Sequence, residues 1–224
     1  MTDPRAPSPA LETIQTKLAN GALDEAGILI DELLVDFASD PNLAYLNALR
    51  YRLSGNAAKA LQTLSDLTTR FPDMARAHQE IAVNCLSINL PQKALEAAET
   101  AVALDGSLLA CWELLAPLQQ RFAPEKQEIT EQQIAFLKSL PQALRTVMSY
   151  LSQNQLNDAE RLCKYFLRDN KTHAEGMRLL SEVLTRKNIL DEAQFLLETL
   201  HQLEPDNVAA AIQLFHVMMR RQRF

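Results

Sequence analysis

Residues 174–207 read AEGMRLLSEVLTRKNILDEAQFLLETLHQLEPDN, and their pattern indicates how the chain folds. Apolar residues recur every three or four positions up to Leu184 and again from Leu190, which is the spacing of two amphipathic helices. Asn188 lies between the two runs, and asparagine tolerates the left-handed conformation that ends a helix. Pro205 follows the second run, and the residue before a proline is pushed out of helical geometry. The stretch therefore predicts one helical hairpin of 34 residues.

The same hairpin recurs along the chain at a step of 34 residues. An alanine early in the second helix marks each copy, at Ala26, Ala60, Ala94, Ala159 and Ala193. The residues at the turn between the two helices keep the same step within two groups, Gly21, Gly55 and Asn89, and then Asn154, Asn188 and Gln222. Self-similarity at this period predicts a solenoid, in which each hairpin stacks on the next.

These features resemble the tetratricopeptide repeat family over nearly the whole chain. The resemblance is carried by the repeated alanine, by glycine or asparagine at the turn, and by Pro72 and Pro205 at hairpin ends. Tyr51 and Trp112 stand where the family often has aromatic residues on the first helix. The resemblance implies an all-α fold, a right-handed superhelical solenoid of helix-turn-helix hairpins. Alanine suits the helix crossing, because two axes approach to about 8–10 Å only where the side chains are short.

The domain organisation follows from where the 34-residue step holds and where it fails. Prolines without apolar periodicity predict a disordered leader over residues 1–9. A first repeat lobe is predicted over 10–116 and a second, ending in a half repeat, over 141–224. Between them, over 117–140, Pro117 should bend or break a helix. The step from Ala94 to Ala159 is also three residues short of two repeats, so an irregular joint is expected there.

Composition narrows the function classes. The net charge is −6, whereas a nucleic-acid partner requires a basic stripe, so no nucleic acid is expected. Charges interrupt the apolar clusters, as in ILIDELLVDF at 28–37, so no membrane partner is expected either. The N-terminus lacks the charged and apolar segments of a secretory signal. The simplest compartment is the cytoplasm.

The sequence contains no recognisable catalytic, cofactor-binding or metal-binding constellation. No two of the four histidines stand at a ligand spacing; they are His78, His173, His201 and His216. The three cysteines, Cys85, Cys111 and Cys163, lie within helical patterns and are interpreted as small buried apolar residues. The chain is therefore predicted to be non-catalytic and to need no cofactor.

Binding of a protein or peptide is the function that the resemblance implies. In the family, the first helices of the hairpins line the concave groove, so the matching positions are the groove candidates. They are Asn42, Tyr45, Leu49, Arg52, Arg76, Gln79, Val83, Glu175, Arg178, Glu182, Arg186, Ile212, His216, Met219 and Arg220.

One subgroup of the family grips the terminal carboxylate of a chaperone with lysines and asparagines. The matching places of this chain hold Leu11, Gln15, Leu46, Arg76 and Glu80. Only one of these is basic, so no such clamp is expected.

An alternative hypothesis is that a basic cluster near the C-terminus contacts an anion or nucleic acid. The cluster comprises Arg220, Arg221 and Arg223, with Arg178 and Arg186. This hypothesis ranks lower because the arginines are few and interleave with glutamates.

The C-terminal helix, Val208 to about Arg221, repeats a first-helix pattern with Leu214, Phe215 and Met218. Three explanations stay open for its apolar face: the helix is itself a cap, residues 208–224 pair with another copy, or a longer protein continues beyond Phe224.

The repeats over 141–224 also resemble those that precede a sulfotransferase domain in some bacterial proteins. That resemblance implies an alternative function, an accessory region that presents substrate to a catalytic domain outside this chain.

Overall fold

The computed structural model describes residues 5–221, and within that range it contains helices and no strand. Their bounds are α1 (Ser8–Ala19), α2 (Leu23–Phe37), α3 (Pro41–Leu53), α4 (Ala57–Arg70), α5 (Ala75–Ser87), α6 (Pro91–Leu104), α7 (Leu109–Phe122), α8 (Gln127–Ser139), α9 (Gln142–Ser152), α10 (Leu156–Asp169), α11 (Ala174–Arg186), α12 (Leu190–Leu203) and α13 (Val208–Arg221), with a 3₁₀ turn at Pro124–Lys126. The predicted all-α class is confirmed.

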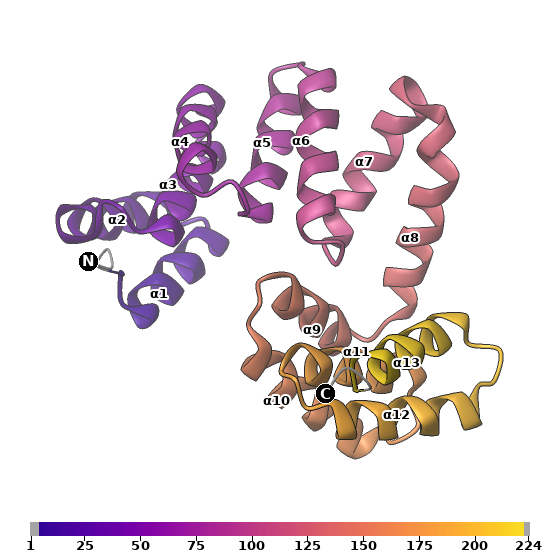
Figure 1. The fold of residues 1–224 in the computed structure, drawn as a ribbon. Helices are drawn as coiled ribbons and strands as arrows, with labels where there is room; N and C mark the ends of the chain where they lie inside the picture. Colours follow the sequence, from indigo (N-terminus) through magenta and orange to yellow (C-terminus); the bar gives the residue numbers. More distant parts are fainter. Residues whose placement is uncertain (1–4, 222–224) are drawn as a thin grey trace. The chain divides into compact units, whose positions relative to one another are not determined.

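Successive helices pack in pairs, as expected for stacked hairpins (Figure 1). The pairs α3–α4, α5–α6, α9–α10 and α11–α12 make the most extensive helix contacts, and α3–α4, α9–α10 and α11–α12 also contact the helix that follows each of them. Contacts between neighbours in sequence dominate, which is the defining property of a solenoid.

The mid-hairpin turns take the conformation that their residues predict. The backbone φ is +76° at Gly21 and +75° at Gly55, and it is +59°, +55° and +62° at Asn89, Asn154 and Asn188. Glycine has no Cβ to clash there, and asparagine is one of the few other residues that visits this region routinely. Gln222, the sixth predicted turn residue, lies outside the described residues.

The repeated alanines lie at the centre of the helix packing. Ala26, Ala60, Ala94, Ala159 and Ala193 all have no exposed surface. Around them pack larger side chains such as Ile14, Ile30 and Leu46 in the first hairpins. The interpretation of the cysteines is also confirmed, because all three are buried.

The chain forms two compact units. Unit 1 comprises residues up to Leu104 together with Ala110–Gln132, and unit 2 comprises Asp105–Leu109 with Gln133 onward. Unit 1 therefore includes α1–α6, and unit 2 includes α9–α13. The lobes expected over 10–116 and 141–224, and the joint over 117–140, stay predictions.

The structure differs from the predicted leader at residues 5–9. Helix α1 already begins at Ser8, and the backbone N–H of Ala6 donates to Oδ2 of the buried Asp40 at 3.0 Å. The other oxygen of Asp40 accepts from the N–H of Leu43 at 2.8 Å and caps α3. One carboxylate thus starts a helix and holds the segment before α1. Residues 1–4 of the predicted leader lie outside the described residues.

Of the bend or break expected at Pro117, the break does not occur, because α7 runs through the proline from Leu109 to Phe122. The proline is exposed, whereas Cys111, Leu115 and Leu118 bury the opposite side of the helix. Tertiary packing on one face therefore outweighs the hydrogen bond that the proline cannot donate. Across the hairpin, the buried hydroxyl of Thr130 on α8 donates to the side-chain oxygen of Gln119 on α7.

Candidate peptide-binding surface

Two first helices of unit 1, α3 and α5, are joined by an ion pair. Arg52 on α3 donates from Nε to Oε2 of Glu80 on α5 at 2.6 Å. The Glu80 side chain is only 10% exposed and that of Arg52 29% exposed, so solvent screens the pair less than it screens a surface pair. The pair fixes the spacing of the two helices on the face where the candidates Tyr45 and Arg76 also lie.

Tyr45 lies beside this pair on α3. Its ring packs against two core clusters, one that includes Leu46 and one that includes Ala48. Burial raises the pKa of Tyr45 to about 12, with a further rise from Glu80, and the positive charges of Arg76 and Arg52 oppose the shift. The phenol therefore stays protonated at neutral pH, where it can donate one hydrogen bond and accept others.

Arg76 supplies a positive charge that the surrounding residues do not neutralise. It is exposed on α5, and no ion pair to it is found among residues 5–221. Since Glu80 is matched by Arg52, the group carries one excess positive charge, although the whole chain carries −6. Such a site attracts a carboxylate locally without making the protein basic.

Apolar side chains follow one helical turn farther along both helices. Leu49 is four residues after Tyr45 on α3, and Val83 is four residues after Gln79 on α5; all four side chains are half-buried. Residues four apart lie on one face of a helix. Polar and charged groups therefore lie beside apolar ones on α3 and α5. We call this the α3–α5 surface, and its residues are Tyr45, Leu49, Arg52, Arg76, Gln79, Glu80 and Val83. Asn42, the remaining candidate on α3, is exposed one turn before Tyr45.

The candidates of unit 2 on α11 bond to one another instead. Arg178 makes two bonds to Glu175, at 2.8 and 2.6 Å, and lies 3.7 Å from Glu182. Glu182 accepts from Arg186 at 2.6 Å, and Arg186 also donates to the carbonyl of Leu151 at 2.8 Å. The bond to Glu175, opposed by burial, raises the pKa of Arg178. A ligand on α11 would have to replace these bonds, so the surface is less suited to binding a charged ligand.

The last candidates lie on α13, where Ile212, His216, Met219 and Arg220 are all exposed. Arg220 donates to the carbonyl of Thr185 at 3.0 Å and to Oδ1 of Asn188 at 3.3 Å. This guanidinium therefore ties α13 to the turn between α11 and α12.

Glu80 is the residue whose role the sequence analysis missed. The sequence analysis considered Glu80 only as a residue that does not fit the carboxylate clamp. In the structure, Glu80 is the anion that pairs with Arg52 on the α3–α5 surface. It lies 28 residues from Arg52, so no local spacing pairs them. The 34-residue register was the available signal, because it places both residues on first helices of adjacent hairpins.

Two further features, a surface hollow and the buried cysteines, give weaker evidence of a binding or catalytic site. A hollow of about 470 Å³ lies between α2 and α3 on unit 1, beside Gly27 and Arg50. A Cβ on Gly27 would come 2.5 Å from Nη1 of Arg50, so this glycine gives the arginine room to lie across α2. Burial raises the pKa of Cys111 and Cys163 to about 12, so neither is a thiolate at neutral pH.

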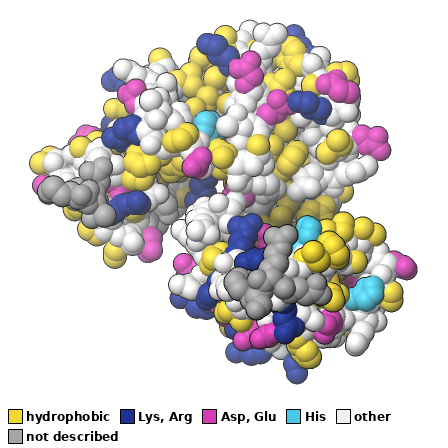
Figure 2. Space-filling model, in the orientation of Figure 1, with side chains coloured by type: hydrophobic (Ala, Val, Ile, Leu, Met, Phe, Trp, Pro, Cys, Tyr) yellow, Lys and Arg dark blue, Asp and Glu magenta, His cyan; other side chains and the backbone are white. Residues whose placement is uncertain are grey.

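No cluster of histidine, cysteine and carboxylate side chains suited to a metal ion occurs in the described part of the chain. No helix there is long and apolar enough to cross a membrane. On the face shown in Figure 2, basic and acidic side chains are interspersed.

Comparison with known proteins gives matches to structures alone. No protein-family model and no curated protein matches the chain. Similar structures include PilF of Pseudomonas aeruginosa, with a TM-score of 0.53, 14% identity and coverage of 91% of this chain and 94% of that one. The structure of Naa15/Naa10 bound to HypK has a TM-score of 0.53, 14% identity and coverage of 96% and 34%. The human IFIT1 dimer with m7Gppp-AAAA has a TM-score of 0.53, 17% identity and coverage of 88% and 55%.

The fold is that of the tetratricopeptide repeat (TPR). These neighbours are TPR proteins, and the chain shares with them the sequential helix packing described above. At this level of identity the likeness concerns the fold only. The chain spans about a third of the Naa15/Naa10 match and about half of the IFIT1 match. A TPR fold fits a scaffold for protein interactions in general.

Proposed function

We propose that the chain is a non-catalytic TPR scaffold that binds an extended protein segment on the α3–α5 surface. The observation that carries the proposal is that Arg76 is exposed and lies next to the protonated Tyr45. The neighbouring Arg52–Glu80 pair is already neutral, so the charge of Arg76 is left for a ligand. The segment that fits this chemistry presents a carboxylate side chain to Arg76 and an apolar side chain to Leu49 and Val83.

The mechanism is docking on a surface that is formed before the ligand arrives. The Arg52–Glu80 pair and the buried face of Tyr45 hold the helices in place, so little ordering free energy is spent on the protein side. Groove recognition by preformed helices reads a few side chains of the ligand and leaves the rest variable. The terminal-carboxylate clamp is not proposed, because Leu46, one of its matching positions, is 1% exposed.

The experiment selects ligands from a displayed library of random peptides and compares variants. The wild-type chain should enrich peptides that combine an acidic and an apolar residue. Arg76→Glu should weaken their binding at least about tenfold, because it reverses the charge that meets the carboxylate. Lys171→Glu, at an exposed lysine of unit 2 between α10 and α11, is the matched control and should leave binding unchanged. Equal binding to wild type and Arg76→Glu would contradict the proposal.

A second function, the accessory region of a sulfotransferase-type enzyme, rests only on the sequence resemblance over 141–224. The coding sequence beyond Phe224 tests it directly. A strand, a glycine-containing loop and a helix there would support a domain that binds a phosphosulfate donor. A stop codon directly after Phe224 would contradict it. A bacterial source and a cytoplasmic location also stay predictions.

Nucleic acid is not proposed as a ligand, although IFIT1 was solved with a capped RNA, because the basic side chains here alternate with acidic ones. A second copy of the chain, the other partner expected from the sequence, would use α13 instead of the α3–α5 surface. The two interactions therefore do not depend on each other.

A further inference from the structure

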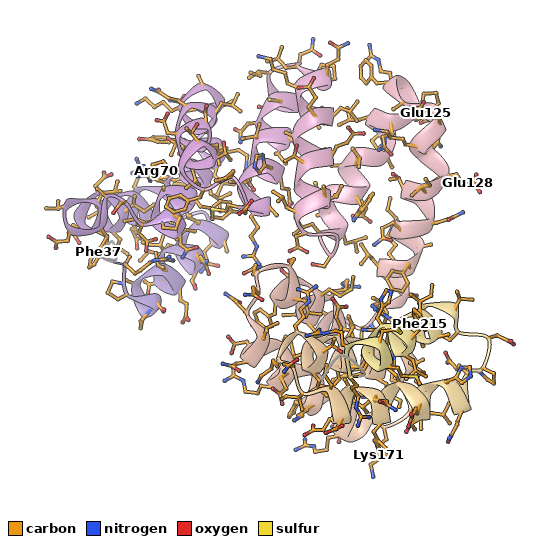
Figure 3. All side chains as sticks on the ribbon, in the orientation of Figure 1. Phe37, Arg70, Glu125, Glu128, Lys171 and Phe215 are labelled. Carbon is orange, nitrogen blue, oxygen red and sulfur yellow. The ribbon has the colours of Figure 1, made fainter. Side chains whose placement is uncertain are left out.

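Helix α13 buries one face and leaves an apolar face exposed. Ala210 and Val217 are fully buried where α13 packs on α12 and α11. On other sides of the helix Val208 is 68% exposed, Phe215 60% and Met218 41%. Phe215 is labelled in Figure 3. Several large apolar side chains exposed together on one helix indicate an interaction surface.

The repeat register shows how unusual Phe215 is. The equivalent residues of earlier first helices are Ile14, Ala48, Ala82, Ala116, Val147 and Ser181, and all but the half-buried Ala116 are at most 1% exposed. Met218 likewise corresponds to Leu184, which is 1% exposed in α11. In those hairpins a small or branched side chain at this position lets a second helix pack closely. A phenylalanine there would hold such a helix away, so a regular second helix is a poor occupant of this face.

A helix that places a small residue against Phe215 would pack more closely on this exposed face. Helix α13 itself offers one, because Ala211 lies one turn before Phe215 on the same side of the helix. We propose that two copies of the chain pair through α13 in an antiparallel arrangement, with Phe215 of each copy over Ala211 of the other. The same alignment places Val208 opposite Met218, so the exposed apolar side chains cover one another.

The dipole of α13 favours the antiparallel direction. The exposed acidic residues Glu204 and Asp206 precede the helix, and the exposed basic residues Arg220 and Arg221 end it. Antiparallel helices also oppose the positive and negative ends of their dipoles. Within each copy Arg221 pairs with Asp191 at 2.7 Å, and Arg220 bonds to Thr185 and Asn188. These arginines are therefore held by their own copy, and the direction of the pair follows from the helix dipoles.

The interface is small, because each copy contributes one helix of 14 residues, about 20 Å long. It lies below the ~1,200 Å² at which stable complexes begin, so we expect a reversible dimer with micromolar affinity. This inference goes beyond peptide binding and needs no ligand on the α3–α5 surface.

Sedimentation of the full chain over about a hundredfold range of concentration tests the association. The wild type should shift from monomer to dimer as concentration rises. Phe215→Glu should stay monomeric throughout, with an unchanged circular dichroism spectrum. Phe195→Glu is the matched control, because Phe195 is a 69% exposed phenylalanine on α12, and it should dimerise like the wild type. A wild type that is monomeric at every concentration, or a Phe215→Glu variant that still dimerises, would overturn the proposal.

Cysteine cross-linking tests the direction and register. In the Val208→Cys/Met218→Cys double variant, mild oxidation should link the two copies. Each single variant should not link, since its cysteines would lie about 15 Å apart along the antiparallel pair, beyond disulfide reach. The native cysteines are buried and give little background. Cross-linking of a single variant indicates a parallel pair and overturns this geometry, even if the chain dimerises.

Discussion

Single residues fix where the helices of this protein end. Asn89, between α5 and α6, holds a backbone φ of +59° and its side chain is exposed, so its contribution is almost entirely conformational. Asn89→Ala should lower the free energy of unfolding by about 1 kcal/mol, because a Cβ without a polar side chain disfavours the left-handed region. Asn89→Gly should be neutral or slightly stabilising. Denaturant melts of the two variants provide the measurement.

Gln92→Ala is the control for that series, because Gln92 is exposed inside α6, a few residues farther on. It should leave the melt unchanged or improve it slightly, since alanine has the highest helix propensity. If Asn89→Ala and Asn89→Gly melt alike, the left-handed turn does not limit the stability of this hairpin.

The residues that could be predicted from the sequence are those whose role is local or repeated. Asn89 and Ala60 were predictable because turn chemistry and helix crossing depend on positions a fixed step apart. The Arg52–Glu80 pair was not, because either residue alone reads as an ordinary solvated charge. Which charges meet depends on how two hairpins stack, and the repeat gives their register but not their side-chain geometry.

Helix α7 tolerates a proline in its interior. Pro117 lies inside it, exposed, and removes the hydrogen bond that would run to the carbonyl of Glu113. Pro117→Ala should restore this donor and raise the free energy of unfolding by about 1–2 kcal/mol, less than the full interior penalty because the folded chain has adapted to the proline. Calorimetry of the variant checks the prediction.

Pro91 offers the comparison, since it is the first residue of α6 and its missing N–H would be unpaired in any case. Pro91→Ala should therefore bring no gain and a small loss. Equal stabilisation by both substitutions would mean that the position of the proline in the helix is irrelevant. The sequence predicted a bend or break at Pro117, but a local rule could not weigh the proline against the burial of Leu115 and Leu118 on the other side of the helix.

Within each of the two units of the molecule, the hairpins form a stack in which each contacts mainly its neighbours in sequence. In such a stack stability is nearly a sum of hairpin and nearest-neighbour terms, and damage stays close to where it is introduced. This locality explains why the period alone predicted the fold class. It also explains why the ligand could not be predicted, because surface residues such as Arg76 are free to vary while the buried alanines hold the stack.

The same locality makes a prediction for amide hydrogen exchange. Ala60→Leu on α4 and Ala193→Leu on α12 each overpack a fully buried site and should cost about 1–3 kcal/mol. Ala60→Leu should speed exchange about tenfold or more in α3–α5 and leave α11–α12 near the wild-type rate, and Ala193→Leu should do the reverse. Ala58→Leu, at an exposed position of α4, should change neither region. If either buried substitution sped exchange equally in both regions, the hairpins would unfold as a single cooperative body, and stability would not be a sum of neighbouring terms.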